Sequence, residues 1–316
     1  MTYNAKEVFE ELKHQSKIIR KILYSQGDLY IPDIKKLKLC IDSTRVIDNK
    51  IVSKMNSCGK WYCSRCDYQK SRIVFSQSFQ LIKKLNNLEV MPIVKLVTLK
   101  IPKVYIDNFI DDKKYLKKCY YKLLKTKMYK NNNICITFEN MMLGASVYHH
   151  VLFNTLKGEE LLIGNHLHII MFMKPSIASH GSITHTMLEK AWFDIISYDK
   201  SLNHGSNKAS VDIRTVTLNE LPNVYFYCIK KVKFNSLYSN SGKLIKLLDI
   251  IKGKQFYSHS GIIKDFRLEI KEEYRILIKE FKKKQDEERG YYLDLTFLDL
   301  TFDERYETIK QQQPPL

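Results

Sequence analysis

The segment from Asn165 to Met173 carries two histidines, His166 and His168, followed by a run of apolar residues. Successive side chains of a β-strand point to opposite faces, so His-x-His holds two imidazoles side by side while the residue between them packs the other way. The apolar run is typical of a strand buried in a sheet. The segment therefore predicts a sheet-based fold with two metal-ligating nitrogens on one face.

A second pattern lies further along the chain, where Tyr227 and Lys230 stand three residues apart. In a helix this spacing puts the phenol and the ammonium group on one face. Tyr225 has no lysine at that spacing, so Tyr227 is the preferred functional tyrosine, and a packing role is the alternative. One His-x-His pair among nine histidines is weak evidence alone, since both could be core histidines. Metal ligands, a phenol and a lysine together favour phosphoryl chemistry.

The charge of the chain is strongly positive and unevenly distributed. Its 52 Lys and Arg residues against 34 Asp and Glu give a net charge of +18. From Asp286 onward eight acidic and three basic residues carry −5, so residues 1–285 carry +23. A field of this sign favours a polyanionic partner, and nucleic acid is the commonest one. The alternative is a lysine-rich composition set by an AT-rich genome.

Four of the seven cysteines lie within 27 residues of one another, and they are Cys40, Cys58, Cys63 and Cys66. The odd count, without an apolar signal segment, argues against a disulfide framework. The C-x2-C half of the pattern lets two thiolates reach one tetrahedral zinc, with Cys58 and Cys40 completing the site. We therefore expect a structural Zn²⁺ site, against the alternative of unliganded or redox-active thiols. Its basic and aromatic flanks suit a module that contacts DNA.

Hydropathy gives no sign of a membrane protein. The sequence has no run of about 18 apolar residues, and residues 1–15 are polar and helix-like. We therefore expect a cytoplasmic chain with no membrane partner. Its 316 residues, 44% of them hydrophobic, suffice for one large domain with appendages or for two domains.

Helical and strand-like segments follow one another without a helix between every pair of strands. This order favours an α+β fold with a central, largely antiparallel sheet flanked by helices. Helices are expected at 5–24, 73–85, 107–129, 185–197 and 268–284, and strands at 94–101, 134–138, 145–153, 165–173 and 211–217. Asn219 is expected to cap the helix that presents Tyr227.

Several segments between Leu37 and Lys264 occur in the order seen in one known family. The chain resembles the replication initiator (Rep) proteins of rolling-circle plasmids, which belong to the HUH endonuclease superfamily. The resemblance rests on Leu96–Leu99 for the first motif, His166–Met171 for the metal motif, Asn223–Lys230 for the tyrosine motif, Lys252–Lys264 for a downstream segment, and the cysteine run for an N-terminal zinc module.

The resemblance implies an HUH endonuclease-like fold and a site-specific, single-tyrosine DNA endonuclease and strand transferase. A divalent ion, Mn²⁺ or Mg²⁺, held by His166 and His168 would polarise the scissile phosphate. Tyr227 would attack it, helped by the charge of Lys230, because a free phenol ionises only near pH 10. The products would be a 5′-phosphotyrosyl link and a free 3′-hydroxyl, and the same site could later rejoin ends.

The implied partners are single-stranded or hairpin origin DNA and host replication proteins, a helicase and a polymerase. The implied organisation has five parts. They are an N-terminal helix at 1–35, a cysteine zinc module at 36–72, an HUH catalytic domain at 73–265, a charged helix at 266–289 and an acidic tail at 290–316.

The chain departs from the family in two places. Many members carry a glutamate as a third metal ligand on the strand before His-x-His, where this chain offers His150 or, in another register, His149. Imidazole suits Mn²⁺ better than Mg²⁺. The plasmid group also tends to have a glutamate four residues before its tyrosine, used to end the cycle. Position 223 is Asn, which cannot act as a base.

A different class of function also fits these patterns, namely a zinc-containing DNA-binding repressor whose catalytic centre is vestigial. Beyond Lys264 the sequence is less informative. The perfect repeat Leu293–Phe297 and Leu298–Phe302 is compatible with an edge strand, a partner-docking peptide or a disordered tail, and the three stay open.

Overall fold

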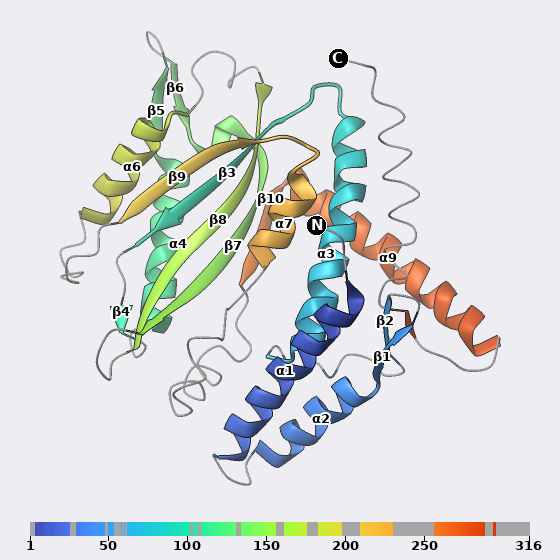
Figure 1. Cartoon of the computed structure of the whole chain (residues 1–316). Coiled ribbons are helices and arrows are strands. Elements are labelled where there is room, and N and C mark those ends of the chain that lie inside the picture. Colours follow the sequence, from blue (N-terminus) through green and yellow to red (C-terminus); the bar gives the residue numbers. More distant parts are fainter. Residues whose placement is uncertain are drawn as a thin grey trace. The chain divides into compact units, whose positions relative to one another are not determined.

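The computed structural model divides the chain into two compact units. The first comprises Met1–Gln77, Leu237–Lys252 and Glu272–Leu316, and the second comprises Ser78–Ser236 and Gly253–Lys271. The structure describes residues 4–25, 30–47, 50–53, 58, 60, 62–101, 104–105, 109–130, 134–155, 161–175, 183–197, 209–229, 256–287 and 293–294 (Figure 1). The predicted Lys230 and most of the duplicated pentapeptide lie outside these residues.

The first unit is built on helices and a small antiparallel sheet. Its elements are α1 (Ala5–Tyr24), α2 (Ile31–Asp42), the first part of α3 (Ser64–Asn86), the last part of α9 (Ile262–Glu287), β1 (Thr44–Ile47), β2 (Lys50–Ser53) and β11 (Leu293–Asp294). The helix predicted at 5–24 is confirmed, and Asn4 caps it by accepting from the backbone N–H of Lys6 at 3.1 Å.

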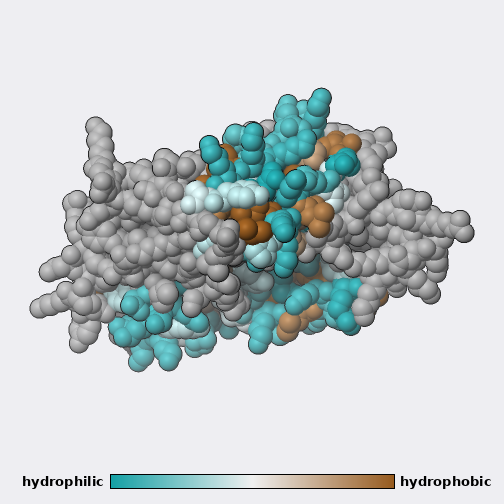
Figure 2. Space-filling view, turned by 90° about the horizontal axis from the view of Figure 1, so that it is seen from below, coloured by the Kyte–Doolittle hydropathy of each residue, from teal (hydrophilic) through white to brown (hydrophobic). Residues whose placement is uncertain are grey.

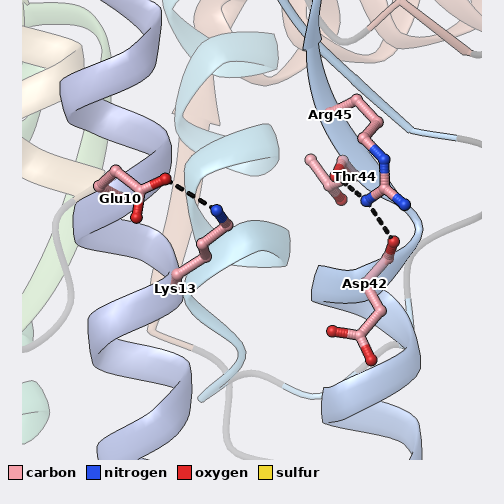
Figure 3. A network of polar contacts seen from close by, with 5 residues as sticks. All are labelled: Glu10, Lys13, Asp42, Thr44 and Arg45. Atoms are coloured by element: carbon pink, nitrogen blue, oxygen red, sulfur yellow. Dashed lines mark hydrogen bonds and ion pairs between the residues drawn. The ribbon is translucent and has the colours of Figure 1, made fainter.

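Polar contacts stabilise the first helix and the turn from α2 into β1. On α1, Lys13 pairs with Glu10 at 2.7 Å. After α2 ends, the Arg45 guanidinium donates to the carbonyl oxygens of Asp42 and Thr44, at 2.7 and 2.9 Å (Figure 3). The Arg45 side chain thereby satisfies carbonyls that the end of a helix leaves open.

The helix predicted at 73–85 lies within α3, which begins nine residues earlier, at Ser64. Its first turn contains Cys66, and the carbonyl of Cys63 accepts from Asp67 N–H at 2.9 Å. The region expected as a cysteine zinc module at 36–72 is therefore helical at both ends. The reason is local: two cysteines three residues apart fit a helical first turn.

The second unit is an antiparallel sheet with helices on both faces. The strand order is β10-β7-β8-β3-β9, and β4 pairs with β8 off this path (Figure 1). The strands are β3 (Ile93–Lys100), β4 (Val104–Tyr105), β7 (Met142–Thr155), β8 (Leu161–Met173), β9 (Ser210–Val216) and β10 (Tyr257–Gly261). Every pairing is antiparallel, so the predicted α+β class with a central antiparallel sheet is confirmed.

One face of the sheet packs on α4 (Phe109–Lys125) and α6 (His185–Ser197). The helix predicted at 185–197 is confirmed, and its Trp192 is fully buried in this core. The helix predicted at 107–129 ends at Lys125 instead. Residues 127–130 form β5 and pair with β6 (Ile134–Thr137), a non-local pairing that helix-like sequence spacing does not reveal.

The other face of the sheet carries α7 (Leu221–Ile229) and the first part of α9. The helix predicted at 268–284 begins at Ile262, directly after β10. Gly261 makes this sharp turn possible with φ +56°, where a Cβ would meet the Leu143 carbonyl oxygen at 2.1 Å. Gly261 therefore lets β10 and α9 follow each other without a loop.

The described surface seen in Figure 2 is largely hydrophilic, with smaller hydrophobic areas between the polar ones. Exposed large hydrophobic side chains include Leu39, Val90, Met91 and Leu268. Among the described residues no helix is long and apolar enough to cross a membrane.

Candidate metal centres and their surroundings

Three buried histidines meet on the sheet face that carries α7. His166 and His168 come from β8, and strand pairing sets His150 of β7 directly opposite His166. One ligand atom from each of the three lies within 4.8 Å of the others. The Nε2 atoms of His166 and His168 are 3.1 Å apart. The predicted pair is thus a triad, and the structure selects His150 rather than His149 as its third member.

His149 points to the opposite face of the sheet because neighbouring strand residues alternate. Its ring stacks on Phe256 with 5.6 Å between ring centroids, and burial lowers its pKa to about 3. Its surroundings are apolar core and the cation of Lys113, which is 3.9 Å from the centre of the Phe256 ring. His149 is therefore a core histidine in this fold.

Each histidine of the triad has one ring nitrogen tied to a neighbouring group. His168 Nδ1 is 3.0 Å from Thr98 Oγ1, and His150 Nε2 donates to the Cys228 carbonyl of α7. His166 is hydrogen-bonded to the backbone of Gly164. Such partners orient metal-binding imidazoles and fix which nitrogen carries the lone pair. A ring that donates from one nitrogen to such a partner keeps the lone pair of its other nitrogen for a ligand.

The geometry fits a metal ion. The Nε2 atoms of His166 and His168 are 3.1 Å apart, and their donor and acceptor roles depend on the tautomers. When both Nε2 atoms lack a proton, their lone pairs repel each other unless a cation lies between them. Two nitrogens bound to one ion at about 2.1 Å stand about 3.0 to 3.4 Å apart for octahedral to tetrahedral angles.

The protonation state of the triad also suits a metal. Burial, with a further contribution from the neighbouring cations, lowers the pKa of His166 to about 3 and of His168 to about 2. Burial lowers the pKa of His150 as well. All three rings are therefore neutral near pH 7, and a metal does not have to displace protons from them.

Tyr227 stands beside this triad on α7. Its side chain is 52% exposed, and its ring centroid lies 5.0 Å from that of His168 and 6.1 Å from that of His150. Tyr225 is fully buried, and its hydroxyl is 2.9 Å from Ser146 Oγ. Of these two tyrosines, Tyr227 is the exposed one with its ring beside the triad, which is the position that the predicted preference requires.

The start of α7 differs from the sequence prediction, since Asn219 is not its cap. Thr217 Oγ1 accepts from Glu220 N–H at 3.3 Å, and the Glu220 carboxylate accepts from Thr217 N–H at 2.8 Å. This reciprocal arrangement is a capping box, whose T-x-x-E pattern was present in the sequence. Asn223 is exposed on α7 and supplies no base.

A second cluster of polar side chains contacts α7, and the sequence analysis did not predict it. Ser146 Oγ is 2.9 Å from both the Tyr225 hydroxyl and His259 Nδ1. The buried guanidinium of Arg267 in α9 lies 4.2 Å from the centre of the Tyr225 ring. These residues come from four elements that only the fold brings together, and no local motif marks them.

The four predicted cysteines form a second candidate metal centre, in the first unit. Cys40 lies in α2, Cys63 and Cys66 lie at the start of α3, and Cys58 lies between. Sulfur distances are 3.6 Å for Cys40–Cys66, 3.4 Å for Cys58–Cys66 and 3.7 Å for Cys40–Cys63. Four sulfurs bound to one zinc at about 2.3 Å stand about 3.8 Å apart. The cluster therefore fits a tetrahedral ion.

Residues that flank this cluster in sequence make contacts inside the first unit. Arg65 is fully buried and donates to Cys40 Sγ at 3.5 Å, where its charge offsets that of thiolates. Lys60 pairs with Asp33 at 2.5 Å, and the Tyr62 hydroxyl also donates to Asp33. The expectation that these basic and aromatic residues contact DNA therefore needs correction for Arg65 and Tyr62, which are buried.

A scan against protein-family models found no match, and searches of curated proteins and solved structures also found none. Fold and sites together define an α+β protein with a possible tetrahedral four-cysteine metal site and a separate three-histidine metal site. Any more specific function rests on the geometry of these sites.

Proposed function

We propose that this protein is a rolling-circle replication initiator of the HUH endonuclease superfamily, which nicks one DNA strand at an origin. One observation carries the proposal. An accessible phenol, Tyr227, lies beside three neutral imidazoles that converge on one point of a rigid sheet. A nucleophile next to a divalent-cation site is the arrangement that phosphoryl transfer to a tyrosine requires.

In the proposed reaction the Tyr227 oxygen forms a bond to the scissile phosphorus while the bond from phosphorus to the 3′-oxygen breaks. The phenol loses its proton and the departing 3′-oxygen gains one, so the products are a 5′-phosphotyrosyl link and a free 3′-hydroxyl. One phosphoester replaces another, so the reverse step can rejoin ends without ATP.

The ion would be held by His150, His166 and His168, and it would supply charge stabilisation to the phosphate oxygens. All three ligands are neutral nitrogens, so we favour Mn²⁺ over Mg²⁺, which prefers oxygen ligands. The cysteine cluster would hold a structural Zn²⁺. Its role would be to close the fold of the first unit, since a four-sulfur site leaves no position for substrate.

Two positions near Tyr227, Lys230 and Asn223, bear on how the proposed reaction begins and ends. Lys230 would follow Tyr227 by about one helical turn and assist its ionisation, but it lies outside the described residues. With Asn223 in place of a glutamate, release of the covalent link would need another base or a second strand end. The expected partners are single-stranded or hairpin origin DNA together with a host helicase and polymerase, in keeping with the +23 charge of residues 1–285.

The decisive experiment incubates the purified full chain with single-stranded DNA from its own replicon and Mn²⁺. We expect a covalent protein–DNA adduct, seen as a shift on a denaturing gel, that EDTA prevents. Tyr227→Phe should abolish it, whereas Tyr225→Phe should leave it, because Tyr225 has no access to DNA. Origin binding without any adduct would contradict the proposal and favour a repressor with a vestigial site.

A further inference from the structure

The sheet face that carries the histidine triad continues across β3 and β9 with charged residues. Lys100 of β3 is paired with His166 on one side, and Thr98 is paired with His168 on one side and Asp212 of β9 on the other. Arg214 is paired with Leu96, two residues further along β3. Paired residues point to the same face, so Lys100, Asp212 and Arg214 share the face of the triad.

Lys100 is held at the edge of the triad. Its backbone carbonyl accepts from the indole N–H of buried Trp192 at 2.9 Å, which fixes the end of β3. The Lys100 side chain is exposed, and its charge contributes to the low pKa of both His166 and His168. Within the described residues its ammonium group has no hydrogen bond or ion pair.

Arg214 occupies the other side of the same area. It is exposed, and its charge acts on Glu220 and Cys228, which lie at the start and near the end of α7. The helix that carries Tyr227 therefore lies within electrostatic range of this guanidinium. Arg214, too, makes no hydrogen bond or ion pair with another described side chain.

The charge balance of this face points to an anionic ligand. A divalent ion on three neutral imidazoles keeps its full charge, and two unpaired cations stand beside it. Two acidic residues, Asp212 and Glu220, offset part of this positive charge. Like charges on one sheet face repel one another, and an anion offsets that repulsion; successive phosphates of a nucleic-acid strand supply negative charges in a row.

We propose that Lys100 and Arg214 form a phosphate-binding site for single-stranded DNA, where each neutralises one backbone phosphate next to the scissile bond. This proposal rests on the proposed function, because it assigns the path of the same substrate from α7 across β3 to β9. Lys100 and Arg214 would also place positively charged side chains of the sheet on the face of the triad, in addition to any contribution from Lys230.

The chain offers a matched control in the same strand. Lys95 has the same charge, but it lies on the opposite sheet face, where it donates to Thr215 Oγ1 at 3.2 Å. A general loss of positive charge would affect Lys95→Gln and Lys100→Gln alike. A phosphate site on the triad face would affect only Lys100→Gln.

The test measures binding of a fluorescent oligothymidylate of about 20 nucleotides to the full chain at several salt concentrations. All variants carry Tyr227→Phe, which prevents covalent attachment. Each lost phosphate contact on a single strand lowers the slope of log K against log salt by about 0.7. We expect this loss for Lys100→Gln and for Arg214→Gln, about twice the loss for the double variant, and no change for Lys95→Gln.

Asp212→Asn should act in the opposite direction and tighten binding, since it removes the offsetting charge. Equal slopes for Lys100→Gln, Lys95→Gln and the parent would overturn the phosphate site, provided circular dichroism shows folded proteins. Failure of the proposed function is a separate result. It would appear as normal slopes and normal variant effects with no covalent adduct in the protein that retains Tyr227.

Discussion

The cysteine cluster and the histidine triad differ in how the chain builds them. Three cysteine ligands fall within nine residues of sequence, and the fourth comes from the preceding helix. The triad instead needs two strands in one register, with His150 opposite His166. The first can close as the local chain folds, whereas the second exists only after the sheet has formed.

The two sites also differ in what they leave open. The cysteine cluster offers four sulfur ligands, with Cys40, Cys63 and Cys66 buried. The triad offers three nitrogens and has an exposed tyrosine at its edge. Closed four-ligand sites are typical of structural metals, and three-ligand sites of catalytic ones. Under the proposed function, the cysteine cluster would therefore stabilise the fold and the triad would take part in the reaction.

The largest expected effect comes from removing one ligand at each site. His168→Ala should reduce nicking by about 10³-fold while the protein still folds and binds DNA, because it deletes one buried ring from a sheet held by other contacts. Cys66→Ser should release the zinc and unfold the first unit, because that metal contributes folding free energy. Metal analysis and nicking of a short oligonucleotide would measure both. If His168→Ala unfolds the protein, or if Cys66→Ser stays folded without zinc, the roles expected of the two sites are wrong.

A second prediction concerns pH and sharpens the view of the triad as pre-arranged. Three ordinary histidines would lose about 10³-fold in metal affinity between pH 7.5 and 5.5, because protons compete for each ring. The pKa values of about 3 and about 2 at His166 and His168 place that competition below this range. Burial also lowers the pKa of His150, so we expect at most about a tenfold loss of Mn²⁺ affinity from pH 7.5 to 5.5 by titration calorimetry. A steep loss would show that the rings titrate normally.

The third prediction tests the residues behind the ligands. Thr98→Val removes the hydroxyl 3.0 Å from His168 Nδ1 and keeps the shape of the side chain. Loss of such a partner should weaken Mn²⁺ binding by about 10 to 100-fold without unfolding the sheet. Thr215→Val, on the opposite face of the sheet, is a control that removes a hydroxyl with no contact to the triad. Equal effects of both variants on Mn²⁺ affinity would argue against an orienting role for Thr98.

The smallest expected effect is that of His149→Gln. Because His149 faces the core on the α4 side, this change should leave the Mn²⁺ dissociation constant unaltered while lowering stability modestly. His150→Gln should weaken Mn²⁺ binding clearly, since it removes a ligand. Calorimetry on both variants checks the register directly, and a larger effect at His149 would place β7 one residue out of register.

The sequence predicted those parts of the fold and site that depend on local spacing. His166 and His168 share a face wherever a strand forms, and the helices at 5–24 and 185–197 follow from periodic apolar residues and their ends. The choice between His149 and His150 was left open, because a slip of one residue exchanges the two faces of a strand. Only pairing with β8 decides it.

Other features depend on contacts between distant segments and had no signal in one sequence. Arg267 meets Tyr225 across more than forty positions of sequence, and Lys100 meets the triad only through strand pairing. The capping box of Thr217 and Glu220 is different, because its T-x-x-E pattern is local and visible in the sequence. This pattern predicts the start of α7 better than a single asparagine at position 219 does.

The hydrogen bond from His150 to the Cys228 carbonyl joins a candidate metal ligand to the helix that carries Tyr227. Binding at one end of such a connection must be thermodynamically linked to position at the other. An ion that holds the His150 ring would also restrain α7, and a DNA strand that displaced α7 would change how tightly the ion is held. A difference between the metal dissociation constants measured with and without DNA would then report a change in the position of Tyr227, even where no strand is cleaved.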